Sequence, residues 1–295
     1  MLDADYAGDA IVAVGDRGHV LISEDGGESW RQVRVPTRAM LTAVSFHDAE
    51  LGVAVGHDAT VLRTADGGRS WQRVYFEPEE ERPFLDIYFH DARNVIAIGA
   101  YGYFLESRDG GETWESREVT ASDPGEVAEP VDAGETYPED FHFNRFAVSD
   151  QGRWYMAAEA GNIYRSDDRG ATWQRLPSPY EGSFMGVLPL AGERLLVYGL
   201  QGTLLFSENA GGNWRPVETG TQATLVSAGI LRDGRVLVAG YSGSVLIADQ
   251  DLAAIRFVQL EQRMGISATL QLESGDLLLF GTGGMMRLPL DTLRK

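Results

Sequence analysis

The 295-residue chain contains no cysteine, which excludes disulfides, thiolate metal sites and cysteine nucleophiles. Basic residues are few: 25 lysines and arginines stand against 44 aspartates and glutamates, giving a net charge of −19. Because contacts with nucleic-acid phosphates need clustered Lys and Arg, we expect no nucleic-acid partner. The sequence has no apolar run near the roughly 18 residues that a transmembrane helix needs.

The sequence also lacks the common catalytic and cofactor motifs. No G-x-S-x-G, H-E-x-x-H, phosphate-binding or dinucleotide-binding motif occurs, and the five histidines are scattered. We therefore predict no catalytic residue, no metal site and no cofactor. A sustained 3.6-residue apolar period is missing as well, whereas short runs rich in Val, Leu and aromatics alternate with Gly, Asp and Asn clusters. This pattern predicts an all-β fold with almost no helix.

What the sequence does contain is a repeated turn of the form Ser-x-Asp-x-Gly-x-Thr-Trp. The aspartate and tryptophan of the clear copies are Asp25 and Trp30, Asp66 and Trp71, Asp109 and Trp114, and Asp168 and Trp173; Asn209 and Trp214 belong to a weaker fifth copy. The aspartate is expected to accept hydrogen bonds from backbone N–H groups of its own loop, and the glycine supplies a positive φ. The tryptophan then begins the next strand by burying its ring. These turns resemble the Asp box of bacterial neuraminidases, and we assign their residues a structural role.

Counting the repeats defines the fold. A small residue closes an apolar strand in each unit, at Gly15, Gly56, Gly99, Ala158, Gly199, Gly240 and Gly281, with intervals of 41, 43, 59, 41, 41 and 41 residues. The last two units keep the strands but have no Asp box. A repeat of this length is typical of propellers. We predict a seven-bladed β-propeller with Asp-box turns, four short strands in each blade, and one domain over residues 1–295.

The ends of the chain do not complete the last repeat. The seventh unit stops too soon for a fourth strand, and Leu2–Tyr6 reads as the first strand of the first unit. Either the seventh blade has three strands, or the natural chain begins upstream with a strand-forming segment and an export signal. We expect the second alternative, and with it a periplasmic or otherwise exported location.

One interval breaks the repeat. The 59-residue interval contains an acidic insertion over residues 115–142, between the third and fourth units, and residues 115–140 carry nine carboxylates against one arginine. It is either a solvated loop or a docking segment or lid over the central channel. Because function in repeat folds usually lies on irregular loops, we take it as the centre of a candidate binding surface.

The candidate partner-binding residues surround this insertion. They lie at the end of the insertion, in turns between second and third strands, and in the crossover that follows: Asp140, His142, Asn144, His57, Tyr101, Tyr241, Glu159 and Tyr180. Asp140, His142 and Asn144 alternate along a strand and could project to one side, although a local structural role is the alternative. Exposed aromatic and polar side chains are typical of recognition surfaces.

The DGG-x-[ST]-W turns, the Val-Ala-Val-Gly and Ala-Ile-Gly strands and the seven units resemble the photosystem II stability/assembly factor-like propellers. That resemblance implies a non-catalytic binding or scaffold protein that is monomeric when free. The acidic insertion and the lack of an evident arginine-rich patch favour a non-photosynthetic bacterial branch. Its expected partner is a membrane protein complex, such as an RND-type exporter, or that exporter's substrate.

A second function class remains open. Sialidases also carry Asp boxes, and glycoside hydrolysis needs only two carboxylates at a suitable separation, which 44 acidic residues could supply. The alternative is therefore a glycan-binding or glycoside-hydrolysing, sialidase-like propeller. The arginine triad and the Tyr–Glu pair of sialidases are not legible in the sequence, which favours the binding protein.

Overall fold

The computed structural model describes residues 1–123 and 141–293, and Asp140 and most of the acidic insertion lie outside this range. In the described residues, the regular elements are β-strands and short 3-10 helices, as the absence of a 3.6-residue period predicts. The helices are Asp16–Gly18, Pro78–Glu80, Leu200–Gly202, Tyr241–Gly243 and Leu290–Leu293. The strands form seven separate sheets, so the chain is a seven-bladed β-propeller with one sheet in each blade.

The chain divides into two compact units, which we describe separately. Unit 1 consists of Met1–Gly99, Phe104–Arg117 and Met264–Lys295 and contains blades one, two, three and seven. Its strands are β1 (Asp3–Ala7), β2 (Ala10–Gly15), β3 (His19–Ser23), β4 (Arg31–Val33), β5 (Leu41–Phe46), β6 (Gly52–Gly56), β7 (Thr60–Thr64), β8 (Gln72–Tyr75), β9 (Phe84–Phe89), β10 (Val95–Gly99), β11 (Phe104–Ser107), β12 (Glu115–Ser116), β26 (Ile266–Gln271), β27 (Leu277–Gly281) and β28 (Gly284–Leu288).

Unit 2 consists of Ala100–Tyr103 and Glu118–Arg263 and contains blades four, five and six. Its strands are β13 (Ala121–Ser122), β14 (Phe143–Val148), β15 (Trp154–Ala158), β16 (Ile163–Ser166), β17 (Trp173–Arg175), β18 (Phe184–Pro189), β19 (Leu195–Gly199), β20 (Leu204–Ser207), β21 (Arg215–Pro216), β22 (Leu225–Ile230), β23 (Val236–Gly240), β24 (Ser244–Ala248) and β25 (Ile255–Gln259). That the whole chain is a single domain stays a prediction.

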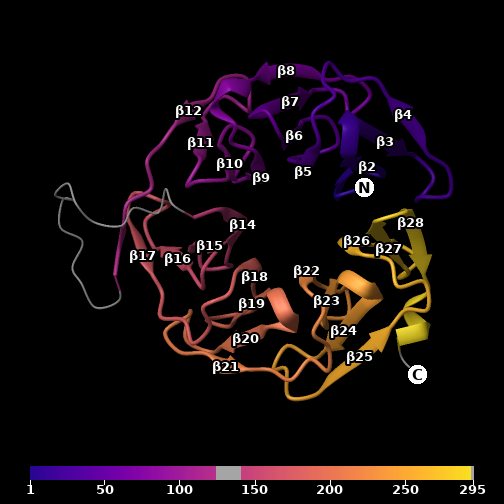
Figure 1. Cartoon of the computed structure of the whole chain (residues 1–295). Coiled ribbons are helices and arrows are strands. Elements are labelled where there is room, and N and C mark those ends of the chain that lie inside the picture. The colour runs from indigo at the N-terminus through magenta and orange to yellow at the C-terminus, as the bar shows by residue number, and fades with distance from the viewer. Residues whose placement is uncertain (124–140, 294–295) are drawn as a thin grey trace. The chain divides into compact units, whose positions relative to one another are not determined.

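Within a blade, consecutive strands pair antiparallel, as in β5 to β8. Figure 1 shows these four strands in sequence order across their blade. The second strands, such as Gly52–Gly56, are buried along their whole length because apolar side chains cover both faces of the sheet. The core lies between neighbouring blades: Val12 and Val14 of blade one pack in one cluster with Leu41 and Leu62 of blade two. This burial on both faces explains why the strands read as near-continuous apolar runs rather than alternating ones.

The Asp boxes form the predicted hydrogen-bonded turns. In blade two, the Thr64 hydroxyl donates to Asp66 Oδ1 at 2.8 Å, and the backbone N–H and the hydroxyl of Ser70 donate to the same carboxylate at 2.9 and 2.6 Å. Trp71 then donates from Nε1 to the Gly68 carbonyl at 3.0 Å. The same hydrogen bonds to the aspartate occur around Asp25, Asp109 and Asp168. In the weak fifth copy, Asn209 Oδ1 accepts from the Ser207 hydroxyl and from the Asn213 N–H. These hydrogen bonds hold the Asp-box turns together.

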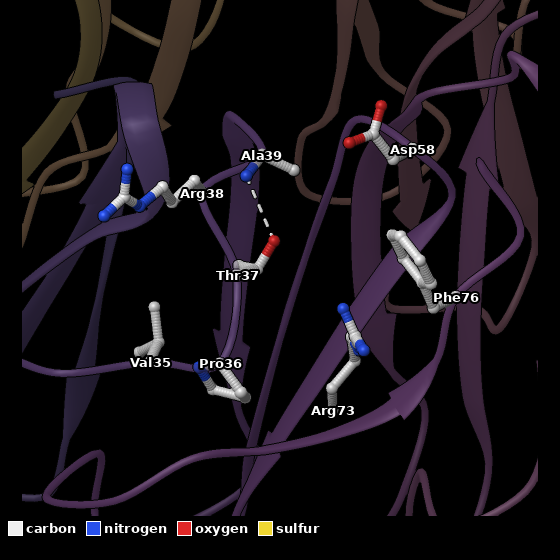
Figure 2. A pocket seen from close by; sticks show the side chains of 8 residues that line it. All are labelled: Val35, Pro36, Thr37, Arg38, Ala39, Asp58, Arg73 and Phe76. Carbon is white, nitrogen blue, oxygen red and sulfur yellow. Dashed lines mark hydrogen bonds between the residues drawn. The ribbon is translucent and has the colours of Figure 1, made fainter.

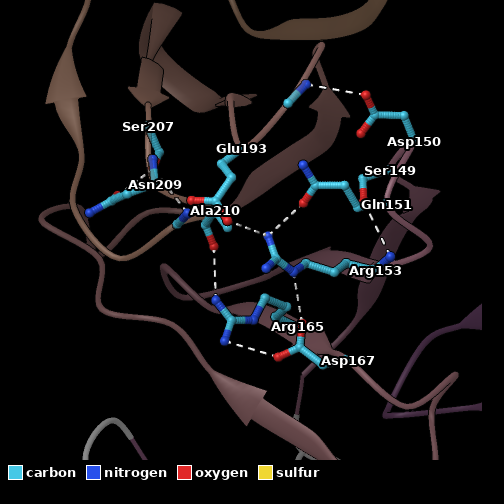
Figure 3. Close-up of polar contacts among 12 residues, drawn as sticks. Ser149, Asp150, Gln151, Arg153, Arg165, Asp167, Glu193, Ser207, Asn209 and Ala210 are labelled. Carbon is cyan, nitrogen blue, oxygen red and sulfur yellow. Dashed lines mark hydrogen bonds and ion pairs between the residues drawn. The ribbon is translucent and has the colours of Figure 1, made fainter.

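Arginine side chains link the box end of one blade to the next blade. Arg63 donates from Nε to the Gly110 carbonyl at 2.8 Å, and Arg165, at the equivalent position of blade four, donates from Nη1 to the Ala210 carbonyl at 3.2 Å. Figure 3 shows the second link, in which Asp167 lies 3.0 Å from both Arg165 and Arg153. Arg63 and Arg165 therefore have a structural role, because each links two neighbouring blades.

Blade seven has three strands in the described residues, β26 to β28, and its first strand packs against blade one. The Met1 ammonium donates to the Gly281 carbonyl at 3.2 Å, and the Ser267 hydroxyl donates to the Met1 carbonyl at 2.9 Å. These bonds join the first and last blades within unit 1. A strand-forming segment and an export signal upstream of Met1 stay predictions.

Candidate functional site

The turns between second and third strands and the crossovers that enter the first strands lie at one end of each blade, opposite the Asp boxes. We call this the turn-and-crossover end. Backbone hydrogen bonds hold each turn against its crossover: His57 N–H donates to the Met40 carbonyl at 2.8 Å, and Tyr241 N–H donates to the Thr224 carbonyl at 2.9 Å. Because the backbone of these turns is fixed, their side chains project from a rigid support.

Three of the predicted partner-binding residues meet at this end of unit 2, and we call Tyr101, His142 and Glu159 the Tyr101 cluster. The rings of Tyr101 and His142 contact each other edge to face, with centroids 4.8 Å apart and an interplanar angle of 83°. His142 Nδ1 lies 3.4 Å from Glu159 Oε1, and the His142 N–H donates to Glu159 Oε2 at 3.2 Å. The cluster thus fixes the imidazole, while Tyr101 remains 51% exposed.

Tyr101 is presented by the conformation of its turn. Its φ of 53° is left-handed, and the equivalent turn residues Arg17, Asp58, Gln201 and Ser242 have φ of 55° to 56°. The next residue, Gly102, donates its N–H to the Phe141 carbonyl at 2.9 Å, which joins the turn to the end of the acidic insertion. A repeat-wide turn conformation therefore places an aromatic side chain beside the one irregular crossover.

Asn144 and Tyr180 contact residues of blade five and are not part of the Tyr101 cluster. Asn144 donates from Nδ2 to the Phe184 carbonyl at 2.8 Å, so its amide links the first strands of blades four and five. The Tyr180 ring packs 5.6 Å from that of Phe184, and its hydroxyl is 3.3 Å from the Leu200 carbonyl. The hydrogen bond to Phe184 supports a local structural role for Asn144, which is the alternative to partner binding.

Among the other predicted residues, Tyr241 belongs to blade six and His57 belongs to blade two. Tyr241 is 50% exposed on the turn of blade six, and its described contact is the backbone bond to Thr224. His57 is exposed on blade two, which belongs to unit 1. Asp140 lies outside the described residues. For all eight residues, partner binding stays a prediction.

The described start of the acidic insertion runs along the outer edge of blade four. Residues Ala121–Ser122 pair in parallel with β17 as a fifth strand of the sheet, an arrangement that the repeat does not predict. Asp123 accepts from Arg175 Nε at 2.7 Å, and Val119 is buried. This part of the insertion is therefore attached to the blade and is not a solvated loop.

A second feature of this end was not predicted from the sequence. In unit 1, a cavity of about 580 Å³ is lined by the crossover Val35–Ala39, Asp58, Arg73 and Phe76. The Arg73 guanidinium lies 4.1 Å from the centroid of the Phe76 ring. The sequence signal was weak but present, because residues 31–38 contain three arginines and no carboxylate in a strongly acidic chain. Two arginines, Arg38 and Arg73, line the cavity together with the carboxylate of Asp58 (Figure 2).

Two carboxylates on β1, those of Asp3 and Asp5, have a structural role. Asp3 Oδ2 accepts from the Val44 N–H at 2.9 Å, and Asp5 Oδ2 accepts from the Phe46 N–H at 2.8 Å, so both link β1 to β5. Burial raises the pKa of Asp5 from 3.8 to about 6, against the opposing effect of its hydrogen bonds from Phe46 and Tyr6. Asp3 and Asp5 are therefore bound to the backbone of the next blade and are poor candidates for a catalytic pair.

This raised pKa predicts a pH dependence of stability. Between pH 3.8 and 6 the unfolded chain loses the Asp5 proton before the folded chain does, so rising pH destabilises the fold through this group. We expect the free energy of unfolding of the natural protein, relative to Asp5→Asn, to fall by roughly 2–3 kcal/mol from pH 4 to pH 7. Urea unfolding of both proteins across this range measures the difference; parallel curves would show that Asp5 titrates normally.

No group of three His, Asp or Glu side chains suited to a metal ion occurs among residues 1–123 and 141–293. The helices of the same ranges are all too short to cross a membrane.

Fold and repeat together define an Asp-box seven-bladed propeller. Residues 22–84 match the model of the family described as photosynthesis system II assembly factor YCF48. Among solved structures, YCF48 bound to a D1 peptide is similar over 97% of this chain and 92% of its own, with 17% identity and a TM-score of 0.74. YCF48 from Cyanidioschyzon merolae is similar over 98% and 95%, with 16% identity and a TM-score of 0.75. The match of residues 22–84 and the likeness of fold support the predicted resemblance to the photosystem II assembly factor-like β-propellers.

The fold itself is shared by proteins of other function. A streptogramin B lyase structure is similar over 97% of this chain and 91% of its own, with 10% identity and a TM-score of 0.75. No match was found among the curated proteins. Because an enzyme has the same architecture, the function has to be argued from the site.

Proposed function

We propose that this protein is a non-catalytic binding propeller whose turn-and-crossover end in unit 2 binds a segment of a membrane protein. The observation that carries the proposal is the Tyr101 cluster, in which an exposed aromatic ring is held by His142 and Glu159 beside the acidic insertion. Rigid, half-exposed aromatic side chains are frequent anchors of protein interfaces. The similar YCF48 structure with a bound D1 peptide supports a peptide as the kind of ligand.

Charge points to the nature of that segment. The insertion adjoining the cluster carries nine carboxylates over residues 115–140, so we expect a basic segment whose association weakens as salt screens the charges. No described contact selects an exporter over another membrane protein. An RND-type exporter, a non-photosynthetic bacterial branch and an exported location therefore stay predictions.

Shortening the insertion tests the proposal. Because Val119 is buried and Ala121–Ser122 belong to the sheet, the deletion should spare residues 118–123 and remove residues 125–138, with a short Gly-Ser link. We expect capture of membrane-protein partners from solubilised membranes of the native host to fall at least about tenfold. Thermal unfolding should change little, since the paired edge of blade four stays intact.

Two further variants separate the effects of the length and charge of the insertion from the effect of the Tyr101 cluster. Changing Glu126, Glu129, Asp132 and Glu135 to their amides keeps the length and should weaken capture most at low salt. Tyr101→Ala removes the exposed ring and should also weaken capture. If all three variants capture partners as the natural protein does, the binding surface lies elsewhere.

The glycan-active alternative has a direct test as well. It would be favoured if the purified protein cleaved a glycoside and a single carboxylate substitution abolished the cleavage. Binding of partners by a protein that cleaves no glycoside is the result that we expect.

A further inference from the structure

Exposed apolar side chains gather on the second-to-third-strand turns of unit 2. Of the five large apolar side chains that are exposed among residues 1–123 and 141–293, three lie on these turns. Tyr101, which belongs to the Tyr101 cluster, is 51% exposed, while Leu200 on blade five is 37% and Tyr241 on blade six 50% exposed. Apolar side chains that gather at one place on a surface, rather than lying singly, mark a site of interaction.

The backbone beneath Leu200 and Tyr241 is fixed. The Leu200 N–H donates to the Ser183 carbonyl at 3.2 Å, and the Tyr241 N–H donates to the Thr224 carbonyl at 2.9 Å. The Tyr180 hydroxyl also donates to the Leu200 carbonyl, at 3.3 Å. A ligand that binds these two side chains therefore does not have to order their turns, which lowers the entropic cost of binding.

The fold does not require apolar side chains at these positions. In unit 1, His57 of blade two and Thr282 of blade seven occupy the equivalent position, directly after the second strand, and each donates the same backbone bond to its crossover. A histidine or a threonine thus completes the turn as well as an apolar residue does. The exposed apolar surface of Leu200 and Tyr241 consequently has a reason other than folding.

Carboxylates border this apolar surface. Glu181, on the crossover into blade five, and Glu261, on the crossover that leaves blade six, are exposed and form no ion pair within the described residues. Arg263 adds one cation to the same segment as Glu261. In a chain of net charge −19, these surroundings attract a basic ligand and repel an anionic one.

The spacing of the two turns suits a helix. Blades five and six, β18–β21 and β22–β25, lie side by side in Figure 1 and share an apolar cluster that includes Leu204 and Leu225. Sheets packed in this way are about 10 Å apart. Side chains on one side of a helix recur after two turns, about 11 Å, whereas those on one side of a strand recur every roughly 7 Å. One face of a helix can therefore cover Leu200 and Tyr241 together.

We propose that Leu200 and Tyr241 bind the apolar face of a basic amphipathic helix in the membrane-protein partner. The inference rests on the proposed function, because it names the chemistry of the bound segment and extends the binding surface to blades five and six. A second copy of this chain is a poorer occupant, since both copies carry a net charge of −19. An anionic bilayer is repelled by the same charge.

Fluorescence anisotropy with a defined peptide tests this surface. The probe is a fluorescein-labelled peptide of two heptads of leucine and lysine with an amphipathic helical period, and the control peptide has the same composition without that period. We expect the probe to bind more tightly than the control peptide. Leu200→Ser/Tyr241→Ser should weaken binding of the probe at least about tenfold.

A matched variant makes the outcome specific. Ile230 is 47% exposed at the end of β22, at the Asp-box end of blade six, so Ile230→Ser removes an equally exposed apolar side chain from the opposite end. It should leave the affinity for the probe unchanged. If the double variant folds poorly, Tyr241→Ser alone tests the surface and should give part of the loss.

Capture of the native partner distinguishes this inference from the proposed function. Tyr101→Ala should lower capture from solubilised membranes of the native host under both. Leu200→Ser/Tyr241→Ser should lower capture only if the surface extends to blades five and six. Loss of capture in Tyr101→Ala but not in the double variant would contradict the inference and leave the proposed function standing, whereas full capture by both variants would contradict both.

Three further results would overturn the inference. The first is equal binding of the amphipathic peptide and its control, and the second is tighter binding of a glutamate–leucine peptide than of the lysine–leucine probe. The third is that the double substitution abolishes self-association, or binding to vesicles of phosphatidylcholine and phosphatidylserine, while the probe does not bind.

Discussion

Replacing Trp71 with alanine is expected to lower the free energy of unfolding by about 3–5 kcal/mol, because a large side chain is lost from a packed core. Trp71 is 6% exposed and contacts Phe46 edge to face, with ring centroids 6.1 Å apart. It belongs to the apolar cluster shared by blades one and two, so a cavity there weakens the contact between two blades. Equilibrium unfolding in urea measures the loss.

Trp114 is the matched control for this substitution. It occupies the same position of the Asp box and donates from Nε1 to the Gly111 carbonyl at 3.1 Å, but its ring is only partly buried. Trp114→Ala should therefore cost less, about 1–2 kcal/mol. Equal losses at the two positions would show that the local turn, rather than burial between blades, determines the contribution of these tryptophans.

Replacing Gly161 with alanine is expected to destabilise the fold by about 3 kcal/mol, through a left-handed backbone and a steric clash. Its φ is 75°, and an added Cβ would lie 2.1 Å from the Tyr180 carbonyl. Since Gly161 N–H also donates to the Gly182 carbonyl at 2.9 Å, the clash would push the crossover away from its turn. Thermal and urea unfolding both report this loss.

Substitution of Gly192 is the control that separates the cost of the left-handed backbone from the cost of the steric clash. Its φ is 73°, but an added Cβ would have no atom within 4 Å. Gly192→Ala therefore carries the backbone cost alone, about 1 kcal/mol. If the two alanine variants were equally stable, the crossover at Tyr180 would be too loosely held to support a fixed surface at this end of blade four.

The repeated parts of the fold could be predicted from sequence because local interactions determine them. The apolar runs at residues 41–46, 52–56 and 60–64 indicate three strands in the sequence alone, and they have the bounds of β5, β6 and β7. Six of the seven second strands end in glycine, and at Gly56 the reason is steric, because an added Cβ would lie 2.0 Å from the Met40 carbonyl. The aspartate or asparagine of each Asp box likewise accepts hydrogen bonds from its own turn, although Trp214 of the fifth copy donates to the distant Pro177 carbonyl.

The candidate site was predicted less completely, because its contacts depend on segments that do not repeat. Tyr101 and Glu159 were selected from their turns, but only the structure shows that both hold His142. Ala121–Ser122 have no strand signature, and their pairing with β17 is a tertiary contact. The arginine cavity combines Arg38 with Arg73, which lie far apart in sequence and meet only when blade two folds.

Site-specific photo-crosslinking measures directly which end of unit 2 contacts the partner. A photoreactive amino acid replaces either the exposed Tyr101 at the turn-and-crossover end or the exposed Ala171 at the Asp-box end of unit 2. Both proteins are then irradiated with the membranes of the native host. The proposed function predicts a crosslinked membrane protein from position 101 and none from position 171. Crosslinks from position 171 alone would contradict the proposed binding surface.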